Sequence, residues 1–220
     1  MKVLKLTSLW VPRDPASAIS HLLGCILAII GTVLLVIQGN KFGGIQYAAA
    51  FAVYGLSMIL LYLASANYHW FNLSERGILV LRKLDHAMIY ILIAGTYTPL
   101  CVLALKGPWG MGMLIAIWGL AVAGILMTVF YFNAPRWLTT GTYLLMGWLA
   151  IVAIVPLYRV LPTAGFAWLL AGGVFYTIGG IIYGRKRSLI DLPGFGFHEV
   201  FHIFVLAGSV CHYLLMWVLI

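Results

Sequence analysis

Long runs of apolar residues alternate with short polar segments along the whole chain. Seven of these runs are long enough for a helix to cross the hydrocarbon core of a membrane, which takes about 20 residues. A porin-type barrel would show short segments of alternating polarity instead. The pattern predicts an all-α, seven-transmembrane helix bundle, with spans at about 17–38, 45–70, 84–104, 110–131, 138–158, 162–184 and 197–219.

The connections between the predicted spans are short, and no linker or low-complexity tract separates them. We therefore expect a single membrane domain over residues 1–220. Its first segment, residues 1–16, mixes Leu, Trp and Lys and is expected to lie along the membrane surface as an interfacial anchor. Glycines in the sixth predicted span would let neighbouring backbones approach closely. They are Gly172, Gly173, Gly179, Gly180 and Gly184.

Composition agrees with a membrane location, because 64% of the residues are hydrophobic and only 8% are charged. So few polar residues cannot cover the surface of a soluble domain. The three cysteines fall inside predicted spans without paired spacing, which indicates neither a disulfide framework nor a thiolate zinc site. The formal charge of +8 does not indicate nucleic-acid binding, because the basic residues lie in the short connections, where they set orientation.

The basic residues are unequally divided between the two sides of the predicted membrane. One side carries Lys41, Lys106 and Arg159. The other side carries Lys2, Lys5, Arg13, Arg76, Arg82, Lys83, Arg136, Arg185, Lys186 and Arg187. Because cytoplasmic loops are enriched in Lys and Arg, we expect the N-terminus in the cytoplasm and the C-terminus outside.

Polar side chains from three predicted helices meet at the cytoplasmic end. His198 and His202 begin the seventh span four residues apart, which places both on one face of a helix, at the spacing one zinc ion needs. His69 ends the second span, and Asp85 begins the third. Ser65 lies one turn deeper than His69 on the same face. These side chains are therefore expected to share one depth.

Three neutral imidazoles and a water in the fourth position form the tetrahedral site that catalytic zinc uses. We predict a zinc site with His69, His198 and His202 as its ligands. Asp85 fits a carboxylate that holds or deprotonates the water, and Ser65 fits a hydrogen-bond donor to the water or to a developing oxyanion. The plainer alternative is that interfacial histidines only snorkel or cap helix ends. Their combination at one depth favours the metal site.

The segment His198-Glu199-Val200-Phe201-His202 also matches the His-Glu-x-x-His signature of metalloproteases, in which the Glu is the general base. An intramembrane protease is therefore a second interpretation. Such a short pattern often arises by chance, and Asp85 supplies a competing base. Glu199 also fits a carboxylate in a first helical turn, where the helix dipole favours it.

The remaining histidines are weaker candidates. His21 and His86 lie on the same side of the membrane, and His86 points away from the face of Asp85, so it is interpreted as interfacial or as an outer-shell residue. His212 lies about 15 Å further along the helix than His202 and cannot share its ion.

Several motifs together resemble the bacterial hemolysin III proteins. They are the segments Leu63-Ala-Ser-Ala-Asn-Tyr-His69, Leu84-Asp-His86, Ala94-Gly-Thr-Tyr-Thr-Pro99, His198-x-x-x-His202 and Gly208-Ser-Val-Cys-His212. These proteins belong with the progestin and adipoQ receptors, which include the adiponectin receptors, and more distantly with alkaline ceramidases. The resemblance implies a multi-pass protein of the bacterial plasma (inner) membrane, with zinc near the cytoplasmic leaflet. It also implies the three histidine ligands named above, with Asp85 and Ser65 on the zinc-bound water, and it requires no Glu after the first histidine.

The expected function is a zinc-dependent integral membrane hydrolase that acts on a lipid amide or ester, as a ceramidase does, and serves membrane lipid homeostasis. A membrane lipid is the expected substrate or ligand, and no nucleic-acid or protein partner is predicted. Two alternatives stay open: a non-enzymatic sensor or receptor-like protein with structural zinc, and a hemolysin-type cytolytic pore. An open fourth coordination position beside a lipid-accessible cavity would favour the hydrolase over the sensor.

Overall fold

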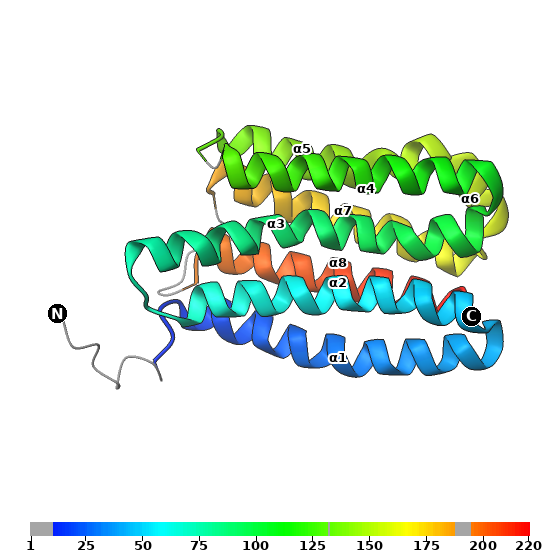
Figure 1. Ribbon diagram of the computed structural model, residues 1–220, viewed down its shortest axis with the longest axis horizontal. Helices are drawn as coiled ribbons and strands as arrows, with labels where there is room; N and C mark the ends of the chain where they lie inside the picture. The colour runs from blue at the N-terminus through cyan, green and yellow to red at the C-terminus, as the bar shows by residue number, and fades with distance from the viewer. Residues whose placement is uncertain (1–10, 132, 188–194) are drawn as a thin grey trace.

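The computed structural model describes residues 11–131, 133–187 and 195–220. Within these residues, seven helices are long and apolar enough to cross a membrane, which confirms the all-α, seven-transmembrane fold predicted from hydropathy. The helices lie side by side along one common direction (Figure 1). Because the number of crossings is odd, α1 begins at one end of the bundle and α8 finishes at the other.

The eight α-helices are α1 (Pro15–Gly43), α2 (Ile45–Trp70), α3 (Glu75–Pro99), α4 (Gly107–Phe130), α5 (Arg136–Trp148), α6 (Ile154–Val160), α7 (Thr163–Arg185) and α8 (Phe197–Val218). Two spans are composite. A wider, π-type helical stretch, Leu100–Leu105, continues α3 after Pro99, which has no N–H to donate to the regular helix ladder. A 3₁₀ stretch, Leu149–Ala153, joins α5 to α6 within the fifth span.

The third helix begins earlier than hydropathy predicts, at Glu75 rather than near residue 84. Ser74 caps it, because its side chain accepts a hydrogen bond from the Gly77 backbone N–H at 3.4 Å. Charged residues lower hydropathy without breaking a helix, since Arg, Lys and Glu are good helix formers. Asp85 therefore lies about ten residues inside α3. The prediction that it begins this helix is wrong.

Helix packing brings the start of the chain against its end. The most extensive contacts join α1 to α2, α2 to α3 and α7 to α8, and α8 also packs against α1. Large apolar side chains cover the outside, among them Leu27, Ile45 and Ile115, each more than 60% exposed. Such an outward-facing apolar surface suits lipid, whereas the polar groups are buried between helices.

Buried tyrosine hydroxyls connect the helices inside the bundle. Tyr62 of α2 donates to Ser209 Oγ of α8 at 2.6 Å, and Tyr176 of α7 lies 2.9 Å from the same oxygen. Tyr97 of α3 donates to the Gly147 carbonyl at 2.7 Å and accepts from the Ala150 N–H at 2.6 Å. The last pair satisfies backbone groups that the change from α5 to the 3₁₀ stretch releases.

Two of the glycines predicted to bring backbones together do so between α7 and α8. A Cβ on Gly172 would lie 2.3 Å from the His212 ring, and one on Gly179 would lie 2.9 Å from Phe204 Cβ. These separations are shorter than real Cβ contacts, so only glycine permits this helix approach. Gly173 differs, because a Cβ there would meet nothing within 4 Å.

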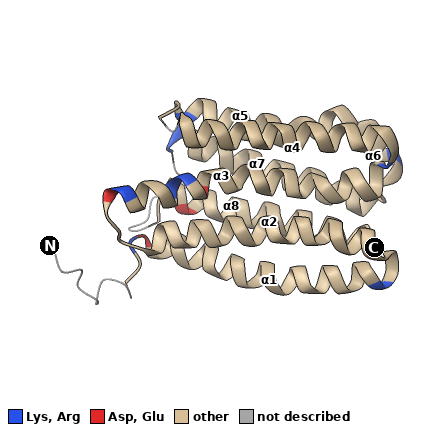
Figure 2. Ribbon diagram, in the orientation of Figure 1, with Lys and Arg blue, Asp and Glu red and all other residues tan. Residues whose placement is uncertain are grey.

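Charged residues gather at the end of the bundle where α2 finishes and α3 begins, and few lie at the opposite end (Figure 2). Lys41 at the end of α1 and Arg159 in α6 lie at that sparse end. We refer to the crowded end as the basic end. Residues 1–10 of the predicted interfacial anchor lie outside the described residues.

We predict that the basic end faces the cytoplasm, because positive charge is retained on that side during insertion. A reporter fused after Ile220 should then be active only if it works outside the cell. An alkaline phosphatase fusion, active outside, and a green fluorescent protein fusion, fluorescent inside, distinguish the two orientations. Cytoplasmic fluorescence from the second fusion would contradict the orientation.

Candidate metal centre

Three histidines occupy the basic end, where α2 finishes and α8 begins. His69 is the second-last residue of α2, and His198 and His202 lie in the first two turns of α8. His69 and His202 are almost fully buried, at 3% and 2% exposed. The four-residue spacing in α8 places its two imidazoles on one helix face, and packing turns that face toward the end of α2.

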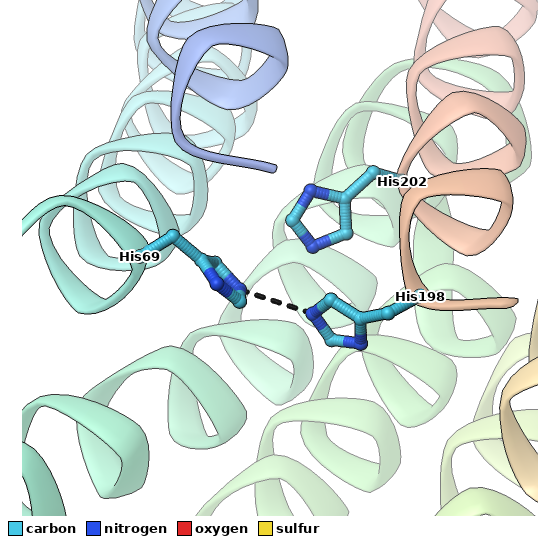
Figure 3. Close-up of side chains that lie close together, drawn as sticks. All are labelled: His69, His198 and His202. Atoms are coloured by element: carbon cyan, nitrogen blue, oxygen red, sulfur yellow. Dashed lines mark hydrogen bonds between the residues drawn. The ribbon is translucent and has the colours of Figure 1, made fainter. Parts of the chain in front are cut away.

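The three imidazoles point into one common space (Figure 3). The Nε2 atoms of His69 and His198 are 3.0 Å apart, and one ligand atom from each of the three histidines lies within 4.8 Å of the other two. Among the described residues, this group comprises the three histidines alone, without a carboxylate.

The donor set fits a divalent metal ion. Imidazole nitrogens bind zinc at about 2.0–2.1 Å, so two nitrogens on a tetrahedral ion lie about 3.3 Å apart. The 3.0 Å between the two Nε2 atoms is close to that separation. His202 would supply the third ligand, since its ligand atom lies within 4.8 Å of those of His69 and His198. The cluster can therefore hold a metal ion.

An apolar cavity of about 160 Å³ extends from the histidines into the bundle between α3, α5, α7 and α8. His198 and His202 line it, and so do Ser65 and Asp85. The Ser65 hydroxyl is buried and has no hydrogen-bond partner among the described residues. Both residues that the sequence assigns to water activation thus face the space beside the imidazoles, although the Asp85 carboxylate stays outside the ligand group.

Comparison with known proteins agrees with this architecture. The model of the family described as Haemolysin-III related matches residues 9–213. The chain belongs to this Haemolysin-III related family. It is 40% identical to Hemolysin-3 of Bacillus cereus over 208 residues, which cover 94% of this chain and 91% of that protein. It is 39% identical to the Hemolysin-3 homolog of Bacillus subtilis over 199 residues, which cover 90% of each.

A more distant relative is the human Monocyte to macrophage differentiation factor, 24% identical over 172 residues, which cover 75% of this chain and 68% of that protein. The sequence resemblance to hemolysin III proteins is therefore confirmed. Family membership and seven membrane-spanning helices make the chain a multi-pass protein of the bacterial plasma (inner) membrane.

In this Haemolysin-III family member, Asp14 holds the far side of the His69 ring. The His69 Nδ1–H donates to Asp14 Oδ2 at 2.9 Å, which leaves Nε2 free to face the other histidines. Arg13 donates to the same oxygen at 3.0 and 3.1 Å. Burial acts to raise the pKa of Asp14, but the hydrogen bonds from His69 and Arg13 and the positive charge of Arg13 outweigh it, so the pKa is lowered. The pKa lies below the usual range, so the group remains a carboxylate.

Backbone hydrogen bonds fix this arrangement. The N–H of Asp14 donates to the His69 carbonyl at 3.0 Å, and that of Arg13 to the Trp70 carbonyl at 3.2 Å. The residues just before α1 therefore cap the end of α2. Sequence reasoning assigned this segment to the membrane surface and missed its role beside His69.

The first turns of α1 also reach His202. The ring of His21 stacks on that of His202 with centroids 3.6 Å apart, and both its nitrogens are buried without a hydrogen-bond partner among the described residues. Ser20 Oγ lies 3.4 Å from His202 Nδ1, where the ring N–H can donate to it. A signal existed in the sequence, because Ser17, Ser20 and His21 are polar residues at helical spacing in an otherwise apolar span.

Glu199 is held in place by two hydrogen bonds. Its Oε1 accepts from Ser17 Oγ at 2.8 Å, and its Oε2 accepts from the Gly196 N–H at 2.8 Å. The second bond caps the start of α8. With both oxygens engaged, Glu199 ties α8 to α1 and lacks the free carboxylate that a protease base needs.

The last two histidines lie apart from the cluster. His86 donates through Nδ1 to the Arg82 carbonyl at 2.6 Å, and its Nε2 lies 3.2 Å from the Tyr183 hydroxyl. His212 lies deeper in α8, with Nε2 at 3.3 Å from the Leu169 carbonyl. Both line the apolar cavity, and neither belongs to the three-histidine group.

We predict that the purified protein contains stoichiometric zinc. Replacing both His198 and His202 with Ala should abolish binding, because one remaining imidazole cannot hold the ion. Elemental analysis by plasma mass spectrometry measures the metal. His212→Gln, a change on the same helix outside the cluster, is the control and should keep its zinc. Zinc retained by the double variant would refute these ligands.

We also predict that Asp14→Asn weakens zinc binding by about 10- to 100-fold, the usual effect of losing an outer-shell carboxylate. The neutral amide oxygen accepts more weakly than the carboxylate, and the amide NH2 can donate instead, so the Nδ1–H tautomer of His69 is held less firmly. Competition with a fluorescent chelator measures the dissociation constant. Glu75→Gln removes an exposed carboxylate at the same end of the bundle and should leave the constant unchanged. Equal affinities of the two variants would contradict the role of Asp14.

Proposed function

We propose that the protein is a zinc-dependent membrane hydrolase that cleaves an amide or ester bond of a lipid. One observation carries the proposal: of the three histidines that can hold a metal ion, His198 and His202 line an apolar cavity that Ser65 and Asp85 also line. When bound, zinc supplies a Lewis acid that activates water near neutral pH. The site of the reaction would thus lie next to the cavity that binds the lipid.

The cavity supports a lipid as the substrate class. Its lining is predominantly apolar and reaches from the histidines to His212, deep between the helices. An acyl chain would pack against this apolar lining, and its carbonyl end would remain beside the imidazoles. Entry from the membrane between helices would avoid moving the chain through water.

Ser65 and Asp85 supply the remaining chemistry in this proposal. Hydrolysis adds water to the carbonyl carbon and breaks the C–N or C–O bond. The Asp85 carboxylate would take a proton from the attacking water and deliver it to the leaving nitrogen or oxygen. The unpartnered Ser65 hydroxyl is free to donate a hydrogen bond to the carbonyl oxygen as negative charge develops on it.

The burial of the Ser65 hydroxyl together with Asp85 beside the histidines favours this reaction over a purely structural metal site. A structural site needs no such polar pair beside it, and burying polar groups between helices costs stability. The two hydrogen bonds of Glu199 also favour Asp85 as the base over Glu199. A lipid hydrolase therefore accounts for more of the site than a sensor or a protease does.

We predict that Asp85→Asn keeps its zinc but lowers lipid hydrolysis by about 10²- to 10⁴-fold, because it removes the proton-transfer group. Release of fatty acid from a ceramide and from a matched ester, in detergent micelles, measures the activity. Glu199→Gln should remain active if it folds. Loss of activity in Glu199→Gln, with Asp85→Asn unaffected, would favour the protease instead. Zinc-loaded protein that hydrolyses neither lipid would count against the hydrolase.

A further inference from the structure

A second cavity, of about 110 Å³, lies at the basic end between α3, α4, α5 and α7. Two arginines line it, Arg82 from α3 and Arg136 from the first turn of α5, together with His86. Tyr131 and Tyr183 also line it. Its lining, in the described parts of the chain, contains no carboxylate, so the cavity is polar and positively charged.

Arg136 is the strongest candidate ligand for an anion in this cavity. Its guanidinium lies over the Tyr183 ring, 4.7 Å from the centroid, and 6.0 Å from that of Phe197. Its Nη1 is buried and has no hydrogen-bond partner among the described residues. A buried cationic donor without a partner is unfavourable, and the planar guanidinium presents its donors in the geometry that phosphate oxygens match.

The start of α5 adds to the positive potential at this cavity. Pro135 precedes the helix without a side-chain cap, and the first turn carries no acidic residue. Ala134, Arg136 and Thr139 line the cavity, so the partial positive charge of this helix N-terminus lies beside the same space.

This basic cavity shares a wall with the apolar cavity. His86, Tyr143 and Tyr183 line both, and the contact between His86 and the Tyr183 hydroxyl lies in that wall. Tyr183 also lies against His198, with ring centroids 5.8 Å apart. A positively charged space thus adjoins a long apolar one, which is the arrangement that an amphiphile with an anionic head requires.

We propose that the cavity between α3, α4, α5 and α7 binds a phosphate group, with Arg136 as its principal ligand and Arg82 as the second cation. The phosphate belongs either to the head of an anionic lipid or to free phosphate. Basic pockets between transmembrane helices at the membrane surface bind anionic head groups in this way. The site does not depend on the metal or on hydrolysis, so each proposal can fail without the other.

General attraction of the basic end for anionic lipids is the competing explanation, and Arg76 separates the two. Arg76 lies in the first turn of α3, is exposed, and lies outside the lining of the cavity. Arg76→Gln therefore removes the same charge from the same end without touching the site. Arg136→Gln removes the charge and the donors from within it.

The experiment measures binding of dioleoyl phosphatidic acid, dioleoyl phosphatidylcholine and inorganic phosphate to the full-length protein in neutral detergent, by microscale thermophoresis. We expect wild type to prefer phosphatidic acid to phosphatidylcholine. Arg136→Gln should weaken binding of phosphatidic acid by about tenfold or more, the effect of losing a hydrogen bond to a charged group. Arg76→Gln should change it by less than about twofold, as expected for an exposed charge.

Inorganic phosphate distinguishes the two sources. If inorganic phosphate competes with phosphatidic acid in wild type but not in Arg136→Gln, the cavity binds the phosphate group alone. If phosphatidic acid binds and inorganic phosphate does not compete, the cavity binds lipid head groups. Circular dichroism and gel filtration check folding. If Arg136→Gln does not fold, Arg136→Lys and Arg82→Gln provide the comparison with Arg76→Gln. The proposal would be overturned if the site variant and Arg76→Gln lost phosphatidic acid binding equally. It would also be overturned if wild type neither preferred phosphatidic acid to phosphatidylcholine nor bound inorganic phosphate.

Discussion

Within a membrane, a polar group must find its partner inside the protein, because lipid tails offer none. The bundle largely meets this requirement. Tyr62 and Tyr176 converge on Ser209, and Tyr97 satisfies the backbone where the fifth span changes its helical type. The few buried polar groups without a partner among the described residues are therefore candidates for binding a ligand. The Ser65 hydroxyl and the Arg136 Nη1 each lie beside a cavity, where a ligand can complete their hydrogen bonding.

The need for a hydrogen-bond partner also applies to the buried histidine cluster. An imidazole has two nitrogens, and a metal ligand must direct one at the ion while something else takes the proton on the other. His69 meets this condition through Asp14, and Ser20 lies in position to do the same for His202. Both partners come from the start of α1. A segment that contributes none of the three imidazoles therefore determines how two of them are presented.

The two cavities divide the interior by chemistry. One is apolar and leads from the histidines toward His212, and the other is basic and opens beside Arg136. Tyr143 and Tyr183 stand between them, with an aromatic face and a hydroxyl each, which suits a boundary between hydrocarbon and charge. Family membership alone does not describe this division. The residues that line both spaces, His86, Tyr143 and Tyr183, come from α3, α5 and α7.

The seven spans, the membrane location and the choice of His69, His198 and His202 as candidate ligands followed from the sequence alone. Hydropathy over about 20 residues reports burial in lipid directly. The spacing of four residues between histidines reports a common helix face. Both are local properties of the chain, so they can be inferred from the sequence. The early start of α3 was missed because a helix can continue through charged residues that hydropathy excludes.

What the tertiary structure alone decided is how distant segments meet. Asp14 lies 55 positions from His69, Ser17 lies 182 from Glu199, and His21 stacks on His202. No periodicity links such pairs, since their contact depends on α1 packing against both α2 and α8. The gathering of Arg82 and Arg136 on one cavity is equally non-local. In the sequence they are simply cationic residues near helix ends, and only helix packing turns them toward the same space.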